Sequence, residues 1–254
     1  MTFADVPLFF SLQEALAALF GNHVKVARSE RVVGGDINQA FRLTLDNGMS
    51  VFMKVNRREN AAFFAAEAEG LRAIAQTGAI GTPGILCRGT DTDGYAFLML
   101  ELIAGARRIP DYQETFAREL AAMHRADTAA FAGAGRYGFH SDNYIGSGEQ
   151  SNTVHDSWTT FFRDCRLAPQ FRRAEGYLDA ADRKRAARLL EKAADILVEP
   201  PHPSLLHGDL WSGNVMTGDD GKAWLIDPAS YVGHAEADLA MTELFGRFSQ
   251  TFYD

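Results

Sequence analysis

The 254-residue chain lacks the features that mark several large classes of protein. Its two cysteines, Cys87 and Cys165, are far apart and show no C-x-x-C spacing, so we predict neither a disulfide framework nor a zinc site and expect free thiols in a reducing compartment. Acidic side chains outnumber basic ones by 33 to 25, which gives no electrostatic reason to expect a nucleic acid as partner. No apolar run reaches about 18 residues and no basic amino-terminal region occurs, so we expect a cytoplasmic protein that binds no membrane. We also expect a monomer.

What the chain does contain is an ordinary globular composition, with 46% hydrophobic and 23% charged residues. It shows no internal repeat and no low-complexity segment. Its length allows one large domain or two lobes.

The first part of the sequence alternates between strand and helix patterns. In "SLQEALAALFG", Ser11 and Glu14 form a capping box and Gly21 closes a short helix. The segments "ERVVGG" and "FRLTLDNGMSVFMKV" have the period of strands, with "DNG" as a hairpin turn, and predict three antiparallel strands. A helix is predicted over 60–76, with Asn60 as a possible cap and Gly78 beyond its end, and "DTDGYAFLMLEL" then predicts a turn and another strand.

The second part is mostly helical. We predict helices over 111–125, 155–174, 180–196 and 236–253, with a loop-and-hairpin segment between the third and the fourth. The fold class is therefore α+β, with an amino-terminal lobe over 1–103 built on an antiparallel sheet and a mainly helical lobe over 104–254.

A lysine and a glutamate are predicted to meet inside the first lobe. On strand 51–55, Lys54 shares a face with Phe52, and Glu67 lies on the apolar stripe of helix 60–76. A carboxylate that faces a core needs a cation, and Lys54 is the nearest candidate. Such a pair handles phosphates in kinases. The alternatives are a purely structural ion pair, or a lysine at a sheet edge whose ammonium reaches water.

Two adjacent glycines, Gly34 and Gly35, stand at a turn between strands, twenty residues before Lys54. Without side chains, their backbone N–H groups can approach phosphate oxygens. The pattern is not a complete G-x-G-x-x-G, and a Gly-Gly pair can also form a turn that has no part in phosphate binding.

The segment "HGDLWSGN" carries the most specific signal. Asp209 follows the histidine by two positions and precedes Asn214 by five, the offsets of the kinase catalytic loop, in which the aspartate accepts a hydroxyl proton and the asparagine binds Mg²⁺. Asp227 ends an apolar strand thirteen residues later, where a second metal ligand would stand. We therefore predict a site here rather than a solvated polar turn.

Segments along nearly the whole chain resemble the fructosamine kinase (ketosamine-3-kinase) family, in the aminoglycoside phosphotransferase-like branch of the protein-kinase-like superfamily. They occur in the family order: "GGDINQAFRL", "FFAAEAEGL", "LAAMHR", "GRYGFHSDNYIG", "QSNTVHDSWTTFFRDCRLAPQ", "HGDLWSGNV" and "GHAEADLAMTELFGRFS". The most specific of them are H-G-D-L-W-S-G-N and the W-x-x-F-F-x-x-x-R-L segment.

The resemblance implies a two-lobed protein-kinase-like fold that uses ATP and Mg²⁺. It implies transfer of the γ-phosphoryl group to a sugar hydroxyl, typically at carbon 3, of a ketosamine such as fructosamine or ribulosamine, as a small molecule or on a glycated protein side chain. Adenine would lie against the linker near Glu101 and Ile103. The remaining roles would fall to Lys54, ordered by Glu67, for the phosphates, Asn214 and Asp227 for the metal, Asp209 for the acceptor hydroxyl, and Trp211 for the sugar or the amine-bearing moiety. Trp211 could also be a core residue.

The sequence departs from the related patterns at several places. Gly208 replaces the arginine of H-R-D and no A-P-E segment follows, so we expect no phosphorylation-controlled activation segment. Asp36 stands where some family members have a redox-active cysteine, so we predict no disulfide switch there; a redox-dependent dimer on a non-reducing gel would contradict this. Ala235 replaces a usual arginine, which casts doubt on the pairing of Asp238. The chain ends inside a helical pattern where the family continues, so we expect a shortened chain or an unusually small second lobe.

Two other functions stay open at this level. A kinase of the same fold could act on an aminoglycoside, a choline-like amine or homoserine, and a protein that keeps the fold could bind nucleotides without catalysis. His124 and His207, taken as exposed, could form a metal pair. We prefer His207 as a hydrogen-bonding residue of the catalytic loop and His124 as a helix-end residue.

Overall fold

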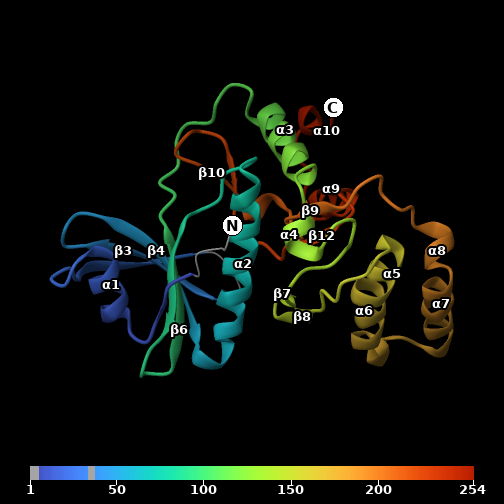
Figure 1. Ribbon diagram of the computed structural model, residues 1–254, viewed down its shortest axis with the longest axis horizontal. Coiled ribbons are helices and arrows are strands. Elements are labelled where there is room, and N and C mark those ends of the chain that lie inside the picture. The colour runs from blue at the N-terminus through green and yellow to red at the C-terminus, as the bar shows by residue number, and fades with distance from the viewer. Residues whose placement is uncertain (1–5, 34–37) are drawn as a thin grey trace.

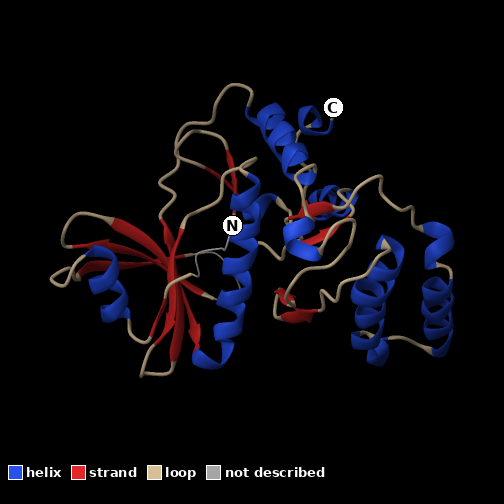
Figure 2. Ribbon diagram, in the orientation of Figure 1, coloured by secondary structure: helices blue, strands red, loops and turns tan. Residues whose placement is uncertain are grey.

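The computed structural model describes residues 6–33 and 38–254. A β-sheet with two flanking helices forms one side of the molecule, and a mainly helical part forms the other (Figures 1 and 2). No helix among the described residues is both long and apolar enough to cross a lipid bilayer.

One six-stranded sheet organises the first hundred residues. Its strand order is β1-β5-β6-β4-β3-β2, in which β1 and β5 run parallel and every other neighbouring pair is antiparallel. The elements in chain order are β1 (Leu8–Phe9), α1 (Leu12–Phe20), β2 (Val26–Val32), β3 (Gln39–Leu45), β4 (Ser50–Arg57), α2 (Ala61–Thr77), β5 (Ile85–Thr90) and β6 (Tyr95–Glu101). The three predicted antiparallel strands are confirmed as β2, β3 and β4, while β1 and β5 were not predicted.

The two faces of β4 bury different side chains, as the period-two pattern predicts. Val51 and Met53 pack in a cluster that includes Leu16 of α1. Phe52 packs on the opposite face against a cluster that includes Phe64 of α2. Lys54 therefore points toward α2.

The rest of the chain is built from short helices and two-stranded pairs. These elements are α3 (Tyr112–His124), α4 (Ala129–Ala132), β7 (Asn143–Ile145), β8 (Gly148–Gln150), α5 (Trp158–Phe162), α6 (Ala168–Arg173), α7 (Ala180–Glu191), α8 (Ala193–Ile196), β9 (Ser204–Leu206), β10 (Val215–Thr217), β11 (Ala223–Leu225), β12 (Tyr231–Gly233), α9 (Glu236–Leu244) and α10 (Gln250–Tyr253). Strand β7 pairs with β8, β9 with β12 and β10 with β11, all antiparallel. The hairpin segment expected before the last helix is thus confirmed.

Two of the four long helices predicted in this part are interrupted, and a third is continuous but contains a π-helical turn. The 155–174 prediction becomes α5, a π-helical turn over Arg163–Leu167, and α6. The 180–196 prediction divides at Lys192 between α7 and α8. The 236–253 prediction ends at Leu244 because Gly246 has φ +99°, which no right-handed helix allows, and α10 starts afresh at Gln250.

The predicted caps are confirmed in part. The hydroxyl of Ser11 accepts the N–H of Glu14 at 3.1 Å, but the Glu14 carboxylate accepts the N–H of Phe10 rather than that of Ser11. Gly78 ends α2 in the left-handed conformation. Asn60 stands at the N-cap position of α2 as predicted, but its side chain donates to Asn56 and accepts no helical N–H.

Candidate active site

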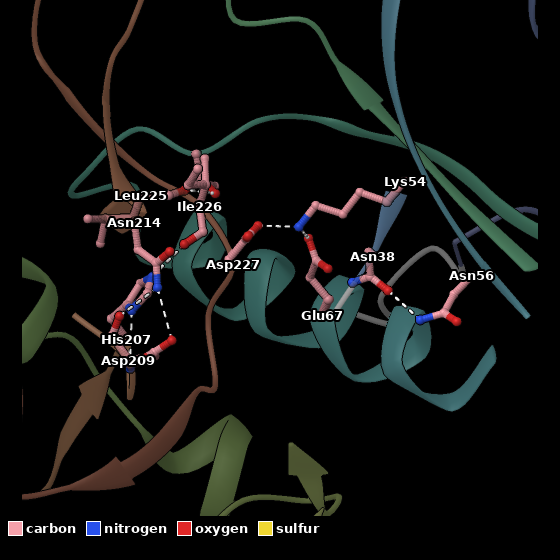
Figure 3. A network of polar contacts seen from close by, with 11 residues as sticks. Asn38, Lys54, Asn56, Glu67, His207, Asp209, Asn214, Leu225, Ile226 and Asp227 are labelled. Atoms are coloured by element: carbon pink, nitrogen blue, oxygen red, sulfur yellow. Dashed lines mark hydrogen bonds and ion pairs between the residues drawn. The ribbon is translucent and has the colours of Figure 1, made fainter. Parts of the chain in front are cut away.

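Lys54 and Glu67 form a buried ion pair, as the sequence pattern indicated. Lys54 Nζ lies 2.7 Å from Glu67 Oε1, and the two side chains are 8% and 11% exposed. The same ammonium also contacts a carboxylate oxygen of Asp227, 173 positions further along the chain. Figure 3 shows Asp227 between Lys54 on one side and Asn214 and Asp209 on the other. The sheet and the helical part therefore meet at this contact.

Burial and charge act against each other in this group. Burial alone would lower the pKa of Lys54, but the carboxylates of Glu67 and Asp227 raise it above its ordinary value, so the ammonium keeps its charge. Burial raises the pKa of Glu67 to about 7, against the opposing charge of Lys54. Two carboxylates thus share one cation, an arrangement that a further positive charge beside Asp227 would relieve.

The catalytic-loop segment, residues 207–214, holds its aspartate and asparagine together. Asn214 Nδ2 donates to the backbone oxygen of Asp209 at 2.8 Å and to Asp209 Oδ2 at 3.0 Å. Burial raises the pKa of Asp209, against the hydrogen bond from Asn214. Because the Asn214 side-chain nitrogen faces Asp209, the side-chain oxygen of the same amide points away from Asp209.

His207 fixes this segment from inside. Its Nε2 lies 2.8 Å from the carbonyl oxygen of Ile226, and its Nδ1 lies 3.2 Å from the backbone nitrogen of Asp209. A carbonyl only accepts and an N–H only donates, so the proton is on Nε2 and the ring is neutral. The prediction that His207 is a structural hydrogen-bonding residue is confirmed, whereas its expected exposure is wrong because the residue is fully buried.

Asp238 of α9 holds the start of the segment, so the doubt about its pairing is not borne out. Its carboxylate accepts the backbone N–H groups of His207 at 2.8 Å and Gly208 at 2.9 Å, and lies 2.9 Å from Nε2 of His124, a buried residue at the end of α3. Burial alone would raise the pKa of Asp238, but the hydrogen bond and charge of His124 lower it below its ordinary value.

The structure explains why glycine stands where kinases have arginine. Gly208 has φ +83°, and a Cβ there would lie 2.1 Å from the carbonyl oxygen of Ala229. Any side chain would therefore collide with the segment that follows Asp227.

Asp227 is the only non-glycine residue with positive φ in the described part of the chain, at 55°. The residues before it are fixed by the β10–β11 pair and by the backbone bond from Ile226 N to Asn214 O, 3.1 Å long. Non-glycine residues in this conformation concentrate at functional sites, where surrounding structure enforces them.

The linker residues Glu101 and Ile103 differ in what they can offer a ligand. The backbone N–H of Glu101 donates to Gly84 O at 2.8 Å, and its side chain accepts from Gly84 N at 3.2 Å. Ile103 follows β6 in an irregular segment and takes part in no backbone hydrogen bond with the described residues. Of the two, Ile103 is therefore the one whose backbone polar groups are open to a base.

The environment of the other predicted site residues is mixed. Trp211 is half-buried and lies against Gly213, whose Cβ would meet the indole at 2.3 Å. Its ring centroid is 5.8 Å from that of exposed Phe245, so it is not a core residue.

Gly34, Gly35 and Asp36 lie outside the described residues. Asn38, the first described residue after this gap, accepts a hydrogen bond from Asn56 Nδ2 at 2.7 Å (Figure 3).

Sequence reasoning missed several residues that shape the site. Asp238 was noted only for a doubtful pairing, and Asn143, Gln150 and Arg166 fell in segments that were quoted for the family resemblance without a role. The signal that could have found them was polar residues inside otherwise apolar segments, because buried polar groups need partners.

The fold is shared with protein-kinase-like phosphotransferases. The aminoglycoside phosphotransferase APH(4)-Ia superimposes with a TM-score of 0.60 at 19% identity, over 90% of this chain and 75% of that one. A Haemophilus somnus protein assigned as a fructosamine-3-kinase superimposes with a TM-score of 0.83 at 30% identity, over 96% of this chain and 79% of that one. The expected fold class is thus confirmed.

Sequence comparison narrows this class to a family. A "probable ketoamine kinase" of Synechocystis is 36% identical over 250 residues, covering 96% of this chain and 80% of that protein. The chloroplastic protein-ribulosamine 3-kinase of Arabidopsis thaliana is 35% identical over 241 residues, covering 92% of this chain and 70% of that protein. A profile of the fructosamine kinase family matches residues 9–254. The chain belongs to the fructosamine kinase family, and the resemblance drawn from its motifs is confirmed.

Proposed function

We propose that this protein transfers the γ-phosphoryl group of ATP to a sugar hydroxyl, typically at carbon 3, of a ketosamine. The observation that carries the proposal is the chain of contacts from Glu67 through Lys54 to Asp227, beside the bonded pair of Asp209 and Asn214. Membership in the fructosamine kinase family supports the reaction class. We assign nucleotide binding to residues 1–103 and the metal and acceptor sites to residues 104–254.

The nucleotide would be held by both parts of the chain. The Lys54 ammonium is oriented by Glu67 and stays charged, which suits contacts with the α- and β-phosphates. The open backbone groups of Ile103 would receive the adenine, with Glu101 shaping the linker through Gly84. We keep the glycine turn at Gly34 and Gly35 as the proposed cover of the phosphates.

The donor set fits Mg²⁺. Asn214 and Asp227 supply two hard oxygens, and the described residues contain no cluster of three or more His, Cys, Asp or Glu that could hold a metal alone. Mg²⁺ keeps waters and takes phosphate oxygens in addition to one or two carboxylates, so two protein ligands suffice. When bound, the ion would neutralise charge on the phosphates. Asp227 would then lie beside two cations, the Lys54 ammonium and the ion.

Asp209 would accept the proton of the acceptor hydroxyl. Asn214 fixes Oδ2 of the carboxylate, which leaves Oδ1 for the hydroxyl. The raised pKa of Asp209 makes it a stronger base than an exposed aspartate. Trp211, two residues later and half-buried, would present an apolar face to the sugar or to its amine substituent.

The acceptor follows from the relatives. Proteins named ketoamine kinase and protein-ribulosamine 3-kinase align over more than nine-tenths of this chain. We propose a ketosamine such as fructosamine or ribulosamine, as a small molecule or as a glycated protein side chain. A cytoplasmic location is part of the proposal, supported by the two free, buried cysteines, which suit a reducing compartment. We further propose a monomer that binds neither nucleic acid nor membrane.

The test is phosphate transfer from radiolabelled ATP to a panel of ribose, fructose and other ketosamine adducts. Asp209→Asn should lower turnover about 10²–10⁴-fold, the usual share of general-base catalysis, while ATP affinity stays near wild type. Asp156→Asn is the matched control, because that carboxylate is exposed and its ion-pair partner among the described residues is Arg136. Unchanged turnover in Asp209→Asn would remove this residue from its role.

The same panel tests the other two functions. Transfer to an aminoglycoside, a choline-like amine or homoserine in place of ketosamines would favour a different acceptor on the same fold. Tight ATP binding with no transfer to any acceptor would favour a non-catalytic nucleotide-binding protein.

A further inference from the structure

Two segments that mark the family resemblance, "DNYIG" and "QSN", take no part in the chemistry proposed above. In the structure they form strands β7 and β8, a short hairpin that lies beside α2 (Figure 1). Asn143 begins β7 and Gln150 ends β8, and both side chains are buried although both are polar. Buried amides need partners, and the partners of these two are specific.

Side chains of the hairpin form hydrogen bonds with the backbone of residues 229 and 230, shortly after Asp227. Asn143 Nδ2 donates to the carbonyl of Ser230 at 2.8 Å. Gln150 Nε2 donates to Asn143 Oδ1 at 2.8 Å and to the carbonyl of Ala229 at 3.4 Å. The two amides therefore act as one unit that holds two consecutive peptide groups.

The same backbone segment is held from two further sides. Ala229 N donates to His207 O at 2.9 Å, which joins it to the catalytic-loop segment. On the third side, α2 lies against it, because a Cβ on Gly70 would come within 2.9 Å of Pro228 Cγ. Gly70 is about one helical turn after Glu67. The contact between Gly70 and Pro228 therefore connects the helix that carries Glu67, which orients Lys54, to the residue that follows Asp227.

Arg166 contacts the next residue of this segment, Tyr231. The guanidinium of Arg166 lies 4.0 Å from the ring centroid of Tyr231, which follows Ser230, and 4.6 Å from that of Phe161. It also donates to Ser151 O and to Asn152 Oδ1, each at 2.7 Å, directly after β8. Arg166 thus contacts both Tyr231 and the residues that directly follow the hairpin.

Only Pro228, Ala229 and Ser230 separate Asp227 from strand β12. Protein kinases place a long segment at this point, and its phosphorylation controls the active arrangement. Here the connection is short, and Asp227 keeps a positive φ that needs support on both sides. The β10–β11 pair supplies that support before it, and the hairpin supplies it after.

We propose that Asn143 and Gln150 are positioning residues that hold the backbone after Asp227, and through it keep Asp227 in its metal-binding place. The proposal rests on the function assigned above to Asp227. It gives the β7–β8 hairpin the task that a phosphorylated segment performs elsewhere. The two residues touch neither nucleotide nor acceptor in this scheme and act only through the backbone of residues 229–230.

The test uses two near-isosteric variants, Gln150→Met and Asn143→Leu, which remove the donated hydrogen bonds without adding a charge. Thr242→Val is the matched control, because the Thr242 hydroxyl is buried and, among the described residues, bonds Leu239 O and the Tyr253 hydroxyl rather than residues 227–231. ATP affinity is measured by calorimetry with and without Mg²⁺, and amide hydrogen exchange is followed over residues 227–231.

We expect the Mg²⁺-dependent gain in ATP affinity to fall about tenfold in Gln150→Met, the effect of one lost hydrogen bond on a binding constant. ATP affinity without Mg²⁺ should stay at the wild-type value, and exchange over 227–231 should accelerate. kcat should fall while KM for the acceptor is unchanged. Thr242→Val should change none of these, even if it lowers the melting temperature equally.

The proposal would be overturned if Gln150→Met and Thr242→Val showed the same Mg²⁺-dependent gain in ATP affinity and the same amide hydrogen exchange over residues 227–231. If Asn143→Leu fails to fold, the ATP affinities and the amide hydrogen exchange of Gln150→Met are sufficient to test the proposal. A wild-type protein that binds ATP equally with and without Mg²⁺ would overturn both this inference and the proposed metal site. A wild-type protein that shows the Mg²⁺ effect but phosphorylates no ketosamine would overturn only the proposed acceptor.

Discussion

Asp238 accepts the backbone N–H of His207 at 2.8 Å, so a residue of α9 fixes the first residue of the catalytic-loop segment. The same carboxylate takes the N–H of Gly208 at 2.9 Å. Charged acceptors make stronger hydrogen bonds than neutral ones, and this acceptor is almost fully buried. The position of Asp209, next along the chain, therefore depends on α9, an element outside residues 207–214.

Replacing Asp238 by Asn should destabilise the protein by about 2–4 kcal/mol, because an amide has one acceptor oxygen for three donors in a buried place. Chemical denaturation at pH 7 measures the difference. The pKa of Asp238 is lower in the folded chain than its ordinary value of 3.8, so its contribution is complete above that value and is lost as the pH falls through the folded pKa. The gap between wild type and variant should therefore close in strong acid. An equal gap at every pH would contradict the assignment.

Replacing Lys54 by Met should lower both stability and activity, for separate reasons. The Glu67 and Asp227 carboxylates would lose their shared cation, at a cost of about 3 kcal/mol, and the phosphates would lose a fixed charge worth about 10²–10³ in turnover. The double variant Lys54→Met/Glu67→Gln should recover much of the stability without recovering turnover. Thermal melting and steady-state kinetics distinguish the two effects. If turnover recovers together with stability, Lys54 has only a structural role.

Replacing Gly70 by Ala tests the contact between α2 and Pro228. Alanine favours a helix over glycine by about 1 kcal/mol, but here its Cβ would lie 2.9 Å from the ring of Pro228. We expect little net change in the melting temperature and a clear loss of turnover, because α2 and Asp227 must move apart. A variant with higher stability and full activity would show that the contact relaxes freely. Gly176→Ala, at an open position, is the control.

The rate of transfer should depend on the ionisation of Asp209. The residue accepts a proton only as a carboxylate, so turnover should fall as the pH drops through its pKa. Burial raises that pKa above the ordinary value of 3.8, so the loss should begin at a higher pH than for an exposed aspartate. A pH–rate profile under saturating ATP and acceptor measures it. A rate that is flat on the acid side down to the pH of unfolding would exclude Asp209 as the base.

Much of the site could be predicted because local spacing fixes it. The offset between Asp209 and Asn214 places both on one turn, where they bond each other. Periodicity placed Lys54 on the face of β4 that meets α2, and placed Glu67 on the stripe of α2 that meets β4. Helix breaks were harder to predict, because the breaks at Lys192 and Gly246 depend on packing and on one dihedral angle rather than on an apolar pattern.

The sequence by itself determined the two kinds of lobe, the pair Lys54–Glu67 and the spacing of Asp209 and Asn214, because each follows from residues within a few turns or one strand of each other. Only the tertiary structure decided that Lys54 also meets Asp227, that Asp238 holds His207, and that Asn143 and Gln150 hold the backbone after Asp227. These contacts join positions far apart in the chain, and their partners are often backbone groups. A backbone carbonyl is the same in every residue, so no residue type in the sequence could reveal which one a buried amide would find.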